Sequence, residues 1–196
     1  MIVQQGITTL DGPAMNPQTR DRLKELFLAR AVSFGQFTLA SGKSSSYYIN
    51  SKKVLFGSEA IALLGDALFD ATSDLDIQAI GGLEVGAIPM ATAASLSYHR
   101  AGRAIEGFFV RKAAKDHGSK SRVEGLVKAG DRVAVIDDVL TTGGSVLQAI
   151  EEIEKLGAVV SRVVCIVDRL QGAREALAKY DYRPLFTIRD LGITGE

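Results

Sequence analysis

The sequence predicts an α/β fold in which a mainly parallel, five-stranded sheet is flanked by helices. Short apolar runs, often β-branched, recur along the chain and alternate with segments of helical spacing. Because these runs are continuous rather than alternating, they indicate strands buried on both faces, which is typical of a parallel sheet covered by helices. The length of 196 residues fits one compact domain.

Composition and charge narrow the class of protein. Hydrophobic residues make up 46% and charged residues 23%, which excludes disordered, collagen-like and disulfide-scaffold classes. The 23 basic and 23 acidic side chains cancel, so bulk charge predicts no general attraction to nucleic acid or membranes. No run approaches the roughly 18–20 apolar residues that cross a bilayer, and residues 1–16 lack a signal-peptide pattern. Since Cys165 is the single cysteine, a cytoplasmic location is expected.

The first predicted elements are a helix and a hairpin. Asn16 and Pro17 look like an N-cap followed by a proline at the first helical position. Residues 34–56 alternate apolar and polar around a turn at 41–46, which predicts two short strands. The apolar positions of the helix are Leu23, Leu26, Phe27 and Ala31.

From Ser58 onward, helices and strands alternate. A helix that begins there precedes a short strand at 77–80, which ends at Gly81 and Gly82. In open α/β sheets ligands bind outside the carboxyl ends of the strands, so chemistry is expected where the strands end. The other predicted elements are helices at 87–98, around 146–153 and at 173–179, and strands at 107–110, 132–136, 162–167 and 185–188.

The most informative segment, residues 137–145, follows the predicted strand at 132–136. A helix that begins here presents unpaired backbone N–H groups and the positive end of its dipole, which makes a monophosphate site without a lysine. Glycines let the backbone approach the anion closely, and hydroxyls add hydrogen-bond donors. The segment reads Asp137, Asp138, Val139, Leu140, Thr141, Thr142, Gly143, Gly144 and Ser145.

The acidic pair, Asp137 and Asp138, requires a ligand with more than a phosphate, because carboxylates repel phosphate. A ribose offers two adjacent hydroxyls to the carboxylates, and Mg²⁺ could share the site. The alternative is a plain strand-to-helix turn with two solvated aspartates. Neither the P-loop spacing nor a Gly-x-Gly-x-x-Gly after a strand occurs, so the common nucleotide-binding motifs are excluded. Residues 133–145 closely resemble the phosphoribosyl-pyrophosphate (PRPP) motif of type I phosphoribosyltransferases, and this resemblance implies their fold.

A basic stretch at 111–122 follows the predicted strand at 107–110. It holds five cationic side chains and one acidic one, a local charge of +4 in a neutral protein. A solvated charge run is the plain alternative. A loop of cations that closed over a leaving pyrophosphate would exclude water and offset its developing charge. Histidine side chains ordinarily change charge near neutral pH, so His117 could donate a proton or hydrogen bond, although a surface histidine is the alternative.

This stretch resembles the catalytic loop of orotate phosphoribosyltransferases, whose pattern is Arg-Lys-x-x-Lys-x-His-Gly. The resemblance implies that the loop contacts PRPP, and that in a homodimer the loop at 111–122 reaches the neighbouring active site. The residues that match are Arg111, Lys112, Lys115 and His117. Together with the acidic pair, the implied catalytic residues are Lys115, His117, Asp137 and Asp138.

The acceptor side also resembles this family. Residues 37–50 are similar to its N-terminal hairpin, which implies that Tyr47 and Tyr48 lie over the base; buried core aromatics are the alternative. Asp168-Arg169 matches a family pair, and a guanidinium suits the planar carboxylate of orotate. We therefore expect Arg169 and Thr141 to bind orotate. A structural Asp–Arg ion pair is the alternative.

Two positions depart from the family pattern. Some members have a PRPP-contacting lysine where this chain has Ala40, with Lys43 nearby, and some have Tyr-Lys where this chain has Glu84-Val85. Residues 81–86 resemble the pyrophosphate loop, which often carries a non-proline cis peptide. The PRPP contacts of the family lysines at Ala40 and at Glu84-Val85 are not transferred to this chain.

The resemblance implies one phosphoribosyltransferase domain over 1–196, with a hood at about 1–56 plus the C-terminal end and a core at about 57–190. It implies a pentosyltransferase that converts orotate and PRPP to orotidine 5′-phosphate and pyrophosphate in pyrimidine synthesis. Mg²⁺ is expected as the cofactor, held through substrate oxygens and water rather than by direct protein ligands. The alternatives are a purine phosphoribosyltransferase and a PRPP-sensing regulator without turnover.

Overall fold

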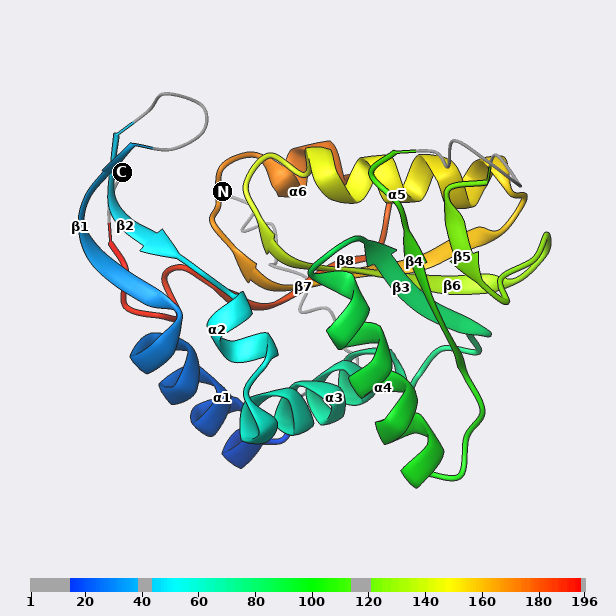
Figure 1. Ribbon diagram of the computed structural model, residues 1–196, viewed down its shortest axis with the longest axis horizontal. Helices are drawn as coiled ribbons and strands as arrows, with labels where there is room; N and C mark the ends of the chain where they lie inside the picture. The colour runs from blue at the N-terminus through cyan, green and yellow to red at the C-terminus, as the bar shows by residue number, and fades with distance from the viewer. Residues whose placement is uncertain (1–14, 39–43, 114–120, 195–196) are drawn as a thin grey trace, which may run out of the picture.

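The computed structural model describes residues 15–38, 44–113 and 121–194. Its main sheet has six strands in the order β5-β4-β3-β6-β7-β8, and neighbouring strands are parallel except at the β5 edge (Figure 1). The parallel α/β prediction is therefore confirmed. The three-residue strand β5 is the addition, because so short a segment carries no apolar pattern. The strands are β3 (Ala79–Leu83), β4 (Glu106–Val110), β5 (Val123–Gly125), β6 (Arg132–Leu140), β7 (Val159–Asp168) and β8 (Tyr182–Thr187).

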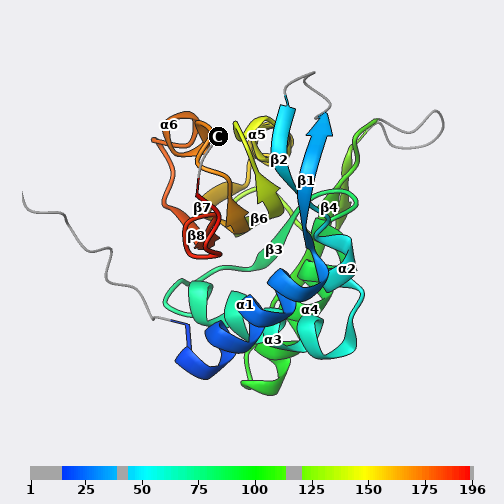
Figure 2. The same ribbon diagram turned by 90° about the vertical axis from the view of Figure 1, so that its left-hand side faces the viewer.

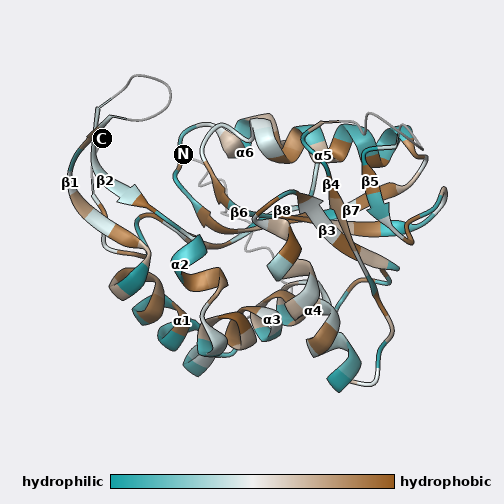
Figure 3. Cartoon of the chain, viewed as in Figure 1, coloured by the Kyte–Doolittle hydropathy of each residue, from teal (hydrophilic) through white to brown (hydrophobic). Residues whose placement is uncertain are grey.

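Helices cover both faces of this sheet (Figure 1). On β6, Ala134 and Ile136 pack into a core with α1, α3 and α4, whereas Val133 and Val135 pack into a second core with α5 and α6. Figure 3 shows hydrophobic residues on the strands and on the helix faces turned toward them. The strands are therefore apolar on both faces because helices cover both faces, as predicted. The helices are α1 (Pro17–Arg30), α2 (Lys52–Leu55), α3 (Ser58–Thr72), α4 (Ala87–Arg100), α5 (Gly144–Lys155) and α6 (Ala173–Ala176).

The N-terminal part confirms the helix and the hairpin. The Asn16 side chain accepts a hydrogen bond of 2.9 Å from the backbone N–H of Gln18, and Pro17 is the first residue of α1. Strands β1 (Val32–Thr38) and β2 (Ser44–Ile49) form a separate antiparallel sheet. The hairpin stands beyond the carboxyl ends of β6 and β7, and Figure 2 turns the molecule so that it faces the viewer.

Several predicted boundaries were wrong. The stretch expected as strand up to residue 56 contains α2, because one helical turn lets the adjacent Val54 and Leu55 both reach the core. Ser44–Ser46, expected in the turn, begin β2. Strand β6 runs four residues further than predicted and includes the acidic pair, and the helix expected at 173–179 is the single turn α6.

Strand β3 includes Gly81 and Gly82, which were expected to end it. A Cβ on Gly82 would lie 1.9 Å from the carbonyl oxygen of Ile136, and one on Gly81 would lie 2.0 Å from that of Phe108. The two glycines therefore let β3 lie against its neighbours on both sides, which is a packing role rather than a turn.

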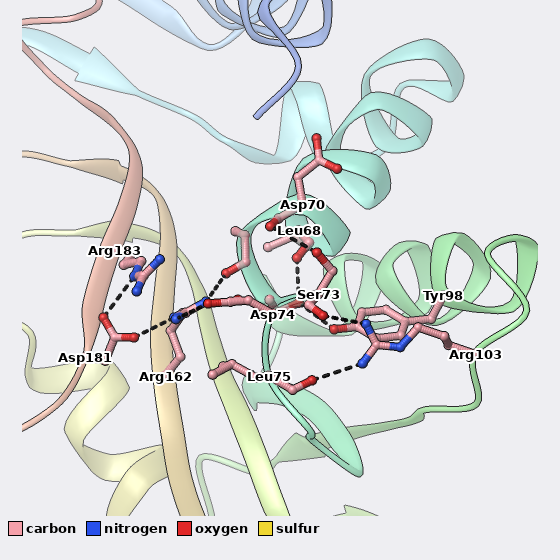
Figure 4. Close-up of polar contacts among 12 residues, drawn as sticks. Leu68, Asp70, Ser73, Asp74, Leu75, Tyr98, Arg103, Arg162, Asp181 and Arg183 are labelled. Carbon is pink, nitrogen blue, oxygen red and sulfur yellow. Dashed lines mark hydrogen bonds and ion pairs between the residues drawn. The ribbon is translucent and has the colours of Figure 1, made fainter. Parts of the chain in front are cut away.

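Arg162 joins three elements at the opposite end of the sheet (Figure 4). The side chain is 2% exposed; its Nη2 donates to Asp74 at 2.9 Å and its Nε donates to Asp181 at 2.7 Å. The hydrogen bond from Arg162 lowers the pKa of Asp74. A buried cation needs such paired carboxylates, so this cluster explains how a charged residue fits into a buried strand.

Candidate active site

The phosphate cradle lies where β6 passes into α5. Gly143 precedes α5 with a φ of 86°, a left-handed conformation that favours glycine, and no side chain caps the helix. The first backbone N–H groups of this 12-residue helix therefore point out of its end, as the sequence analysis predicted. Thr142 and Gly144 are exposed, whereas Thr141 and Ser145 are half-buried.

Asp137 is buried and held at both oxygens. Its Oδ1 accepts from the backbone N–H of Asp138 at 2.9 Å, and its Oδ2 accepts from the Ser145 hydroxyl at 2.6 Å. Burial raises the pKa of Asp137 to about 7, and the negative charge of Asp138 adds to this increase. The carboxylate is therefore poised between protonated and ionised forms at neutral pH.

Asp138 is half-buried and contacts three different segments. Its Oδ1 accepts from the backbone N–H of Val139 at 2.9 Å, and its Oδ2 accepts from the hydroxyl of Ser51. Gly86, in the loop after β3, lies so close that a Cβ there would be 2.9 Å from the Asp138 Cγ. The peptide bond between Glu84 and Val85 in that loop is cis. The predicted pyrophosphate loop and the acidic pair thus lie side by side.

The acceptor side brings Arg169 and Tyr47 together. The Arg169 Nε donates to the Tyr47 hydroxyl at 3.0 Å, and the guanidinium carbon lies 4.6 Å from the Tyr47 ring centroid. Both residues line a cavity of about 520 Å³. Its other lining residues are Leu170, Gln171, Ile188, Arg189, Ile193 and Thr194.

Tyr48 does not join this group. Successive side chains of a strand point to opposite faces, so Tyr47 is buried while Tyr48 is 45% exposed and contacts Phe37 at a centroid distance of 5.7 Å. The structure therefore separates the two tyrosines that were expected to act as a pair. Arg169 is connected to β6 through its backbone N–H, which donates to the Leu140 carbonyl at 2.9 Å.

The two ends of the basic loop are tied together by Arg122. Its Nε donates to the Arg111 carbonyl at 2.7 Å and its Nη2 donates to the Lys112 carbonyl at 3.0 Å. The Glu84 carboxylate accepts from the backbone N–H of Lys112 at 2.8 Å, which connects the loop to the predicted pyrophosphate loop. Arg111 lies 3.8 Å from Glu124.

Two predicted site residues, Lys115 and His117, lie outside the described residues. So do Ala40 and Lys43, the positions that were compared with a family lysine. The sequence did not predict the contacts that four further residues make at the site. These residues are Ser51, Glu84, Gly86 and Arg122. Their contacts join segments far apart in the chain, so periodicity gives no signal for them. Within the described part, no group of three or more His, Cys, Asp or Glu residues could hold a metal ion.

No helix in the described ranges is both long and apolar enough to span a membrane. A family model for the phosphoribosyl transferase domain matches residues 58–188. The orotate phosphoribosyltransferase of Methanocaldococcus jannaschii is 42% identical over 165 residues, which cover 83% of this chain and 90% of that protein. That of Corynebacterium glutamicum is 41% identical over 182 residues, covering 92% and 97%.

A solved structure also resembles this chain. The crystal structure of Mycobacterium tuberculosis orotate phosphoribosyltransferase in complex with PRPP is 35% identical, covers 89% of this chain and 99% of that chain, and superposes with a TM-score of 0.76. The matched domain contains the acidic pair, the phosphate cradle and Arg169. The chain therefore belongs to the orotate phosphoribosyltransferase family.

Proposed function

We propose that this chain transfers ribose 5-phosphate from PRPP to orotate, giving orotidine 5′-phosphate and pyrophosphate, with its site residues in the following roles. The observation that carries the proposal is the order of groups around the carboxyl ends of β6 and β7: the uncapped N-terminus of α5, the acidic pair, and Arg169 beside the cavity. This order matches the order of groups in the substrates, which are a phosphate, a diol and a carboxylated base.

The ribose 5-phosphate is held by residues of one short segment. The backbone N–H groups and hydroxyls of residues 139–145 bind the 5′-phosphate, with the helix dipole of α5 favouring the anion. Asp137 and Asp138 accept hydrogen bonds from the ribose hydroxyls. A carboxylate has about four acceptor sites, so each aspartate can keep its protein contacts and still accept from a hydroxyl.

Orotate lies on the other side of the reacting carbon. Arg169 pairs with its carboxylate and Tyr47 holds the guanidinium in place, while Thr141 supplies a second hydrogen bond. Tyr48 stays a predicted orotate contact. Its side chain lies on the other face of β2 from Tyr47, so this contact would require orotate to reach that face. As the ribose C1–O bond breaks, pyrophosphate takes its electron pair, and orotate N1 forms the new bond to C1. The proton that N1 gives up passes to the departing pyrophosphate or to solvent, which balances the step.

Charge on the leaving pyrophosphate is offset by the loop. Arg111, Lys112, Lys115 and His117 contact PRPP there, and Lys115 and His117 act in catalysis with the acidic pair. No covalent nucleophile is needed, because positioning and charge stabilisation lower the barrier to an oxocarbenium-like transition state. Arg122 and Glu84 fix the base of the loop, as their contacts with Arg111 and Lys112 indicate.

Mg²⁺ is the proposed cofactor. Both oxygens of Asp137 and of Asp138 already accept hydrogen bonds from the protein, which fits an ion held mainly through PRPP oxygens and water. When bound, the ion would neutralise part of the pyrophosphate charge. We place the reaction in the cytoplasm, in agreement with Cys165, the single cysteine of the chain, which is buried and forms no disulfide.

A direct assay tests the reaction. Purified protein with PRPP and Mg²⁺ is expected to consume orotate, followed by its ultraviolet absorbance, and to release pyrophosphate in equal amount. Omission of PRPP is the control. Turnover of a purine base instead would point to a purine phosphoribosyltransferase, and tight PRPP binding without any turnover would point to a regulator.

We also propose a homodimer in which the loop at 111–122 serves the partner's active site. Apolar side chains on and next to α4 support a partner surface, since Val85 is 51% and Leu96 is 49% exposed. Mixing Lys115→Ala protein with Arg169→Ala protein, after subunit exchange, should restore about a quarter of wild-type activity, because half of the dimers are hybrids with one intact site. If the loop serves its own subunit, mixing restores nothing.

A further inference from the structure

Ser51 connects the N-terminal hairpin to the acidic pair. It lies two residues after the end of β2 and is the N-cap of α2, where its carbonyl accepts from the backbone N–H groups of Val54 and Leu55 at 2.8 and 2.9 Å. Val54 and Leu55 belong to the core shared with α1 and α3. The Ser51 backbone is therefore fixed by the core, and the residue is only 4% exposed.

The hydroxyl of this fixed residue donates to the Asp138 Oδ2. Val139 is the other donor to this carboxylate within the described part of the chain; its backbone N–H belongs to the next residue and moves with Asp138. The Ser51 hydroxyl thus connects the Asp138 carboxylate, on β6, to the start of α2. Gly86 closes a second side, because a Cβ at that position would be 3.0 Å from the Asp138 Oδ2.

We propose that Ser51 is a positioning residue that orients the Asp138 carboxylate toward the ribose hydroxyls of PRPP. The inference rests on the proposed function, because it takes Asp138 as a ribose ligand. The same strand, β2, carries Tyr47, which contacts Arg169. A short stretch of the hood therefore sets the position of a ribose ligand and of an orotate ligand.

A double-mutant cycle on PRPP binding tests this role. Ser51→Ala is expected to weaken PRPP binding, measured by calorimetry, by roughly tenfold, the usual scale for a lost hydrogen bond to a charged group. In an Asp138→Ala background the same substitution should produce no further loss, because its partner is gone. Binding of inorganic pyrophosphate, which has no diol, should stay at the wild-type level.

Ser97→Ala is the matched control. Ser97 is 6% exposed, and its hydroxyl donates to Asp66 at 2.7 Å. The substitution therefore removes a similar buried contact, between α3 and α4 and away from the site. This variant should bind PRPP like wild type, and the urea midpoints of the two alanine variants should be similar.

Equal losses of PRPP binding in the wild-type and Asp138→Ala backgrounds would overturn the proposal, and so would equal losses for PRPP and pyrophosphate. Because binding is measured directly, the cycle can be read even if the wild type consumes no orotate. An inactive wild type would therefore count against the proposed function, and additive losses would count against the role of Ser51.

Discussion

Arg169→Ala is expected to lower kcat/KM for orotate by roughly 100- to 1000-fold, which corresponds to about 2.7–4 kcal/mol. Arg169 is only 6% exposed, and its guanidinium is held against the ring and hydroxyl of Tyr47 beside the cavity. A fixed guanidinium binds a carboxylate without the loss of side-chain freedom that a mobile one would undergo. Steady-state kinetics with orotate varied at saturating PRPP measure the effect.

Two further variants separate binding from folding. Tyr47→Phe keeps the ring but removes the acceptor of the Arg169 Nε, so it should give a smaller loss for orotate than Arg169→Ala. Arg174→Ala, on α6 and outside the cavity lining, is the matched control and should behave like wild type. PRPP binding should be close to wild type in all three variants. Retained orotate activity in Arg169→Ala would refute the assignment.

The elements that the sequence predicted well are those with a strong local pattern. Strand β6 and helix α5 combine a continuous apolar run, a carboxylate pair and a glycine turn within 24 residues, Arg132–Leu140 followed by Gly144–Lys155. Each of these features depends on neighbours in the chain, so composition and spacing are enough to find both elements, although not the end of β6. The same holds for the Asn16 cap of α1.

Other features depend on contacts between distant segments. Ser51 and Asp138 are 87 positions apart, and no periodic pattern marks a serine that will meet a carboxylate. Gly81 and Gly82 look like a turn in sequence but lie within a strand, because their missing side chains make room for neighbouring strands. The separation of Tyr47 from Tyr48, in contrast, follows from strand alternation and was open to prediction.

Asp137→Asn is expected to abolish most activity and yet stabilise the free protein at neutral pH. The ordinary pKa of this carboxyl is 3.8, and burial raises it to about 7 in the folded state. Between these two values the folded state binds more protons than the unfolded state, so its free energy of unfolding falls as the pH rises. Above about pH 7 both states are ionised and this contribution levels off.

Asparagine removes this dependence while it preserves the shape of the side chain. Its amide can still contact the Ser145 hydroxyl and the Asp138 backbone N–H, so the local structure is retained. The variant should therefore gain stability relative to wild type as the pH rises from 5 to 7, by at most about 1.4 kcal/mol per pH unit. Activity should fall by roughly 100-fold, because an amide is a weaker acceptor for the ribose hydroxyls.

Urea denaturation of both proteins at half-unit steps from pH 5 to 8 measures the difference. Carboxyls whose pKa is lowered by ion pairs or hydrogen bonds, such as Asp74 and Asp190, are common to both proteins and cancel in the comparison. Asp66→Asn, which alters a carboxylate held by Ser97 away from the site, reports effects of charge loss alone. If the Asp137→Asn difference is constant across this range, the buried carboxylate is not the destabilising group. A difference that grows up to about pH 7 would mean that ionisation of the buried Asp137 carboxyl destabilises the free protein. Such a cost is expected for a carboxylate whose proposed partners, the ribose hydroxyls, are present only when PRPP is bound.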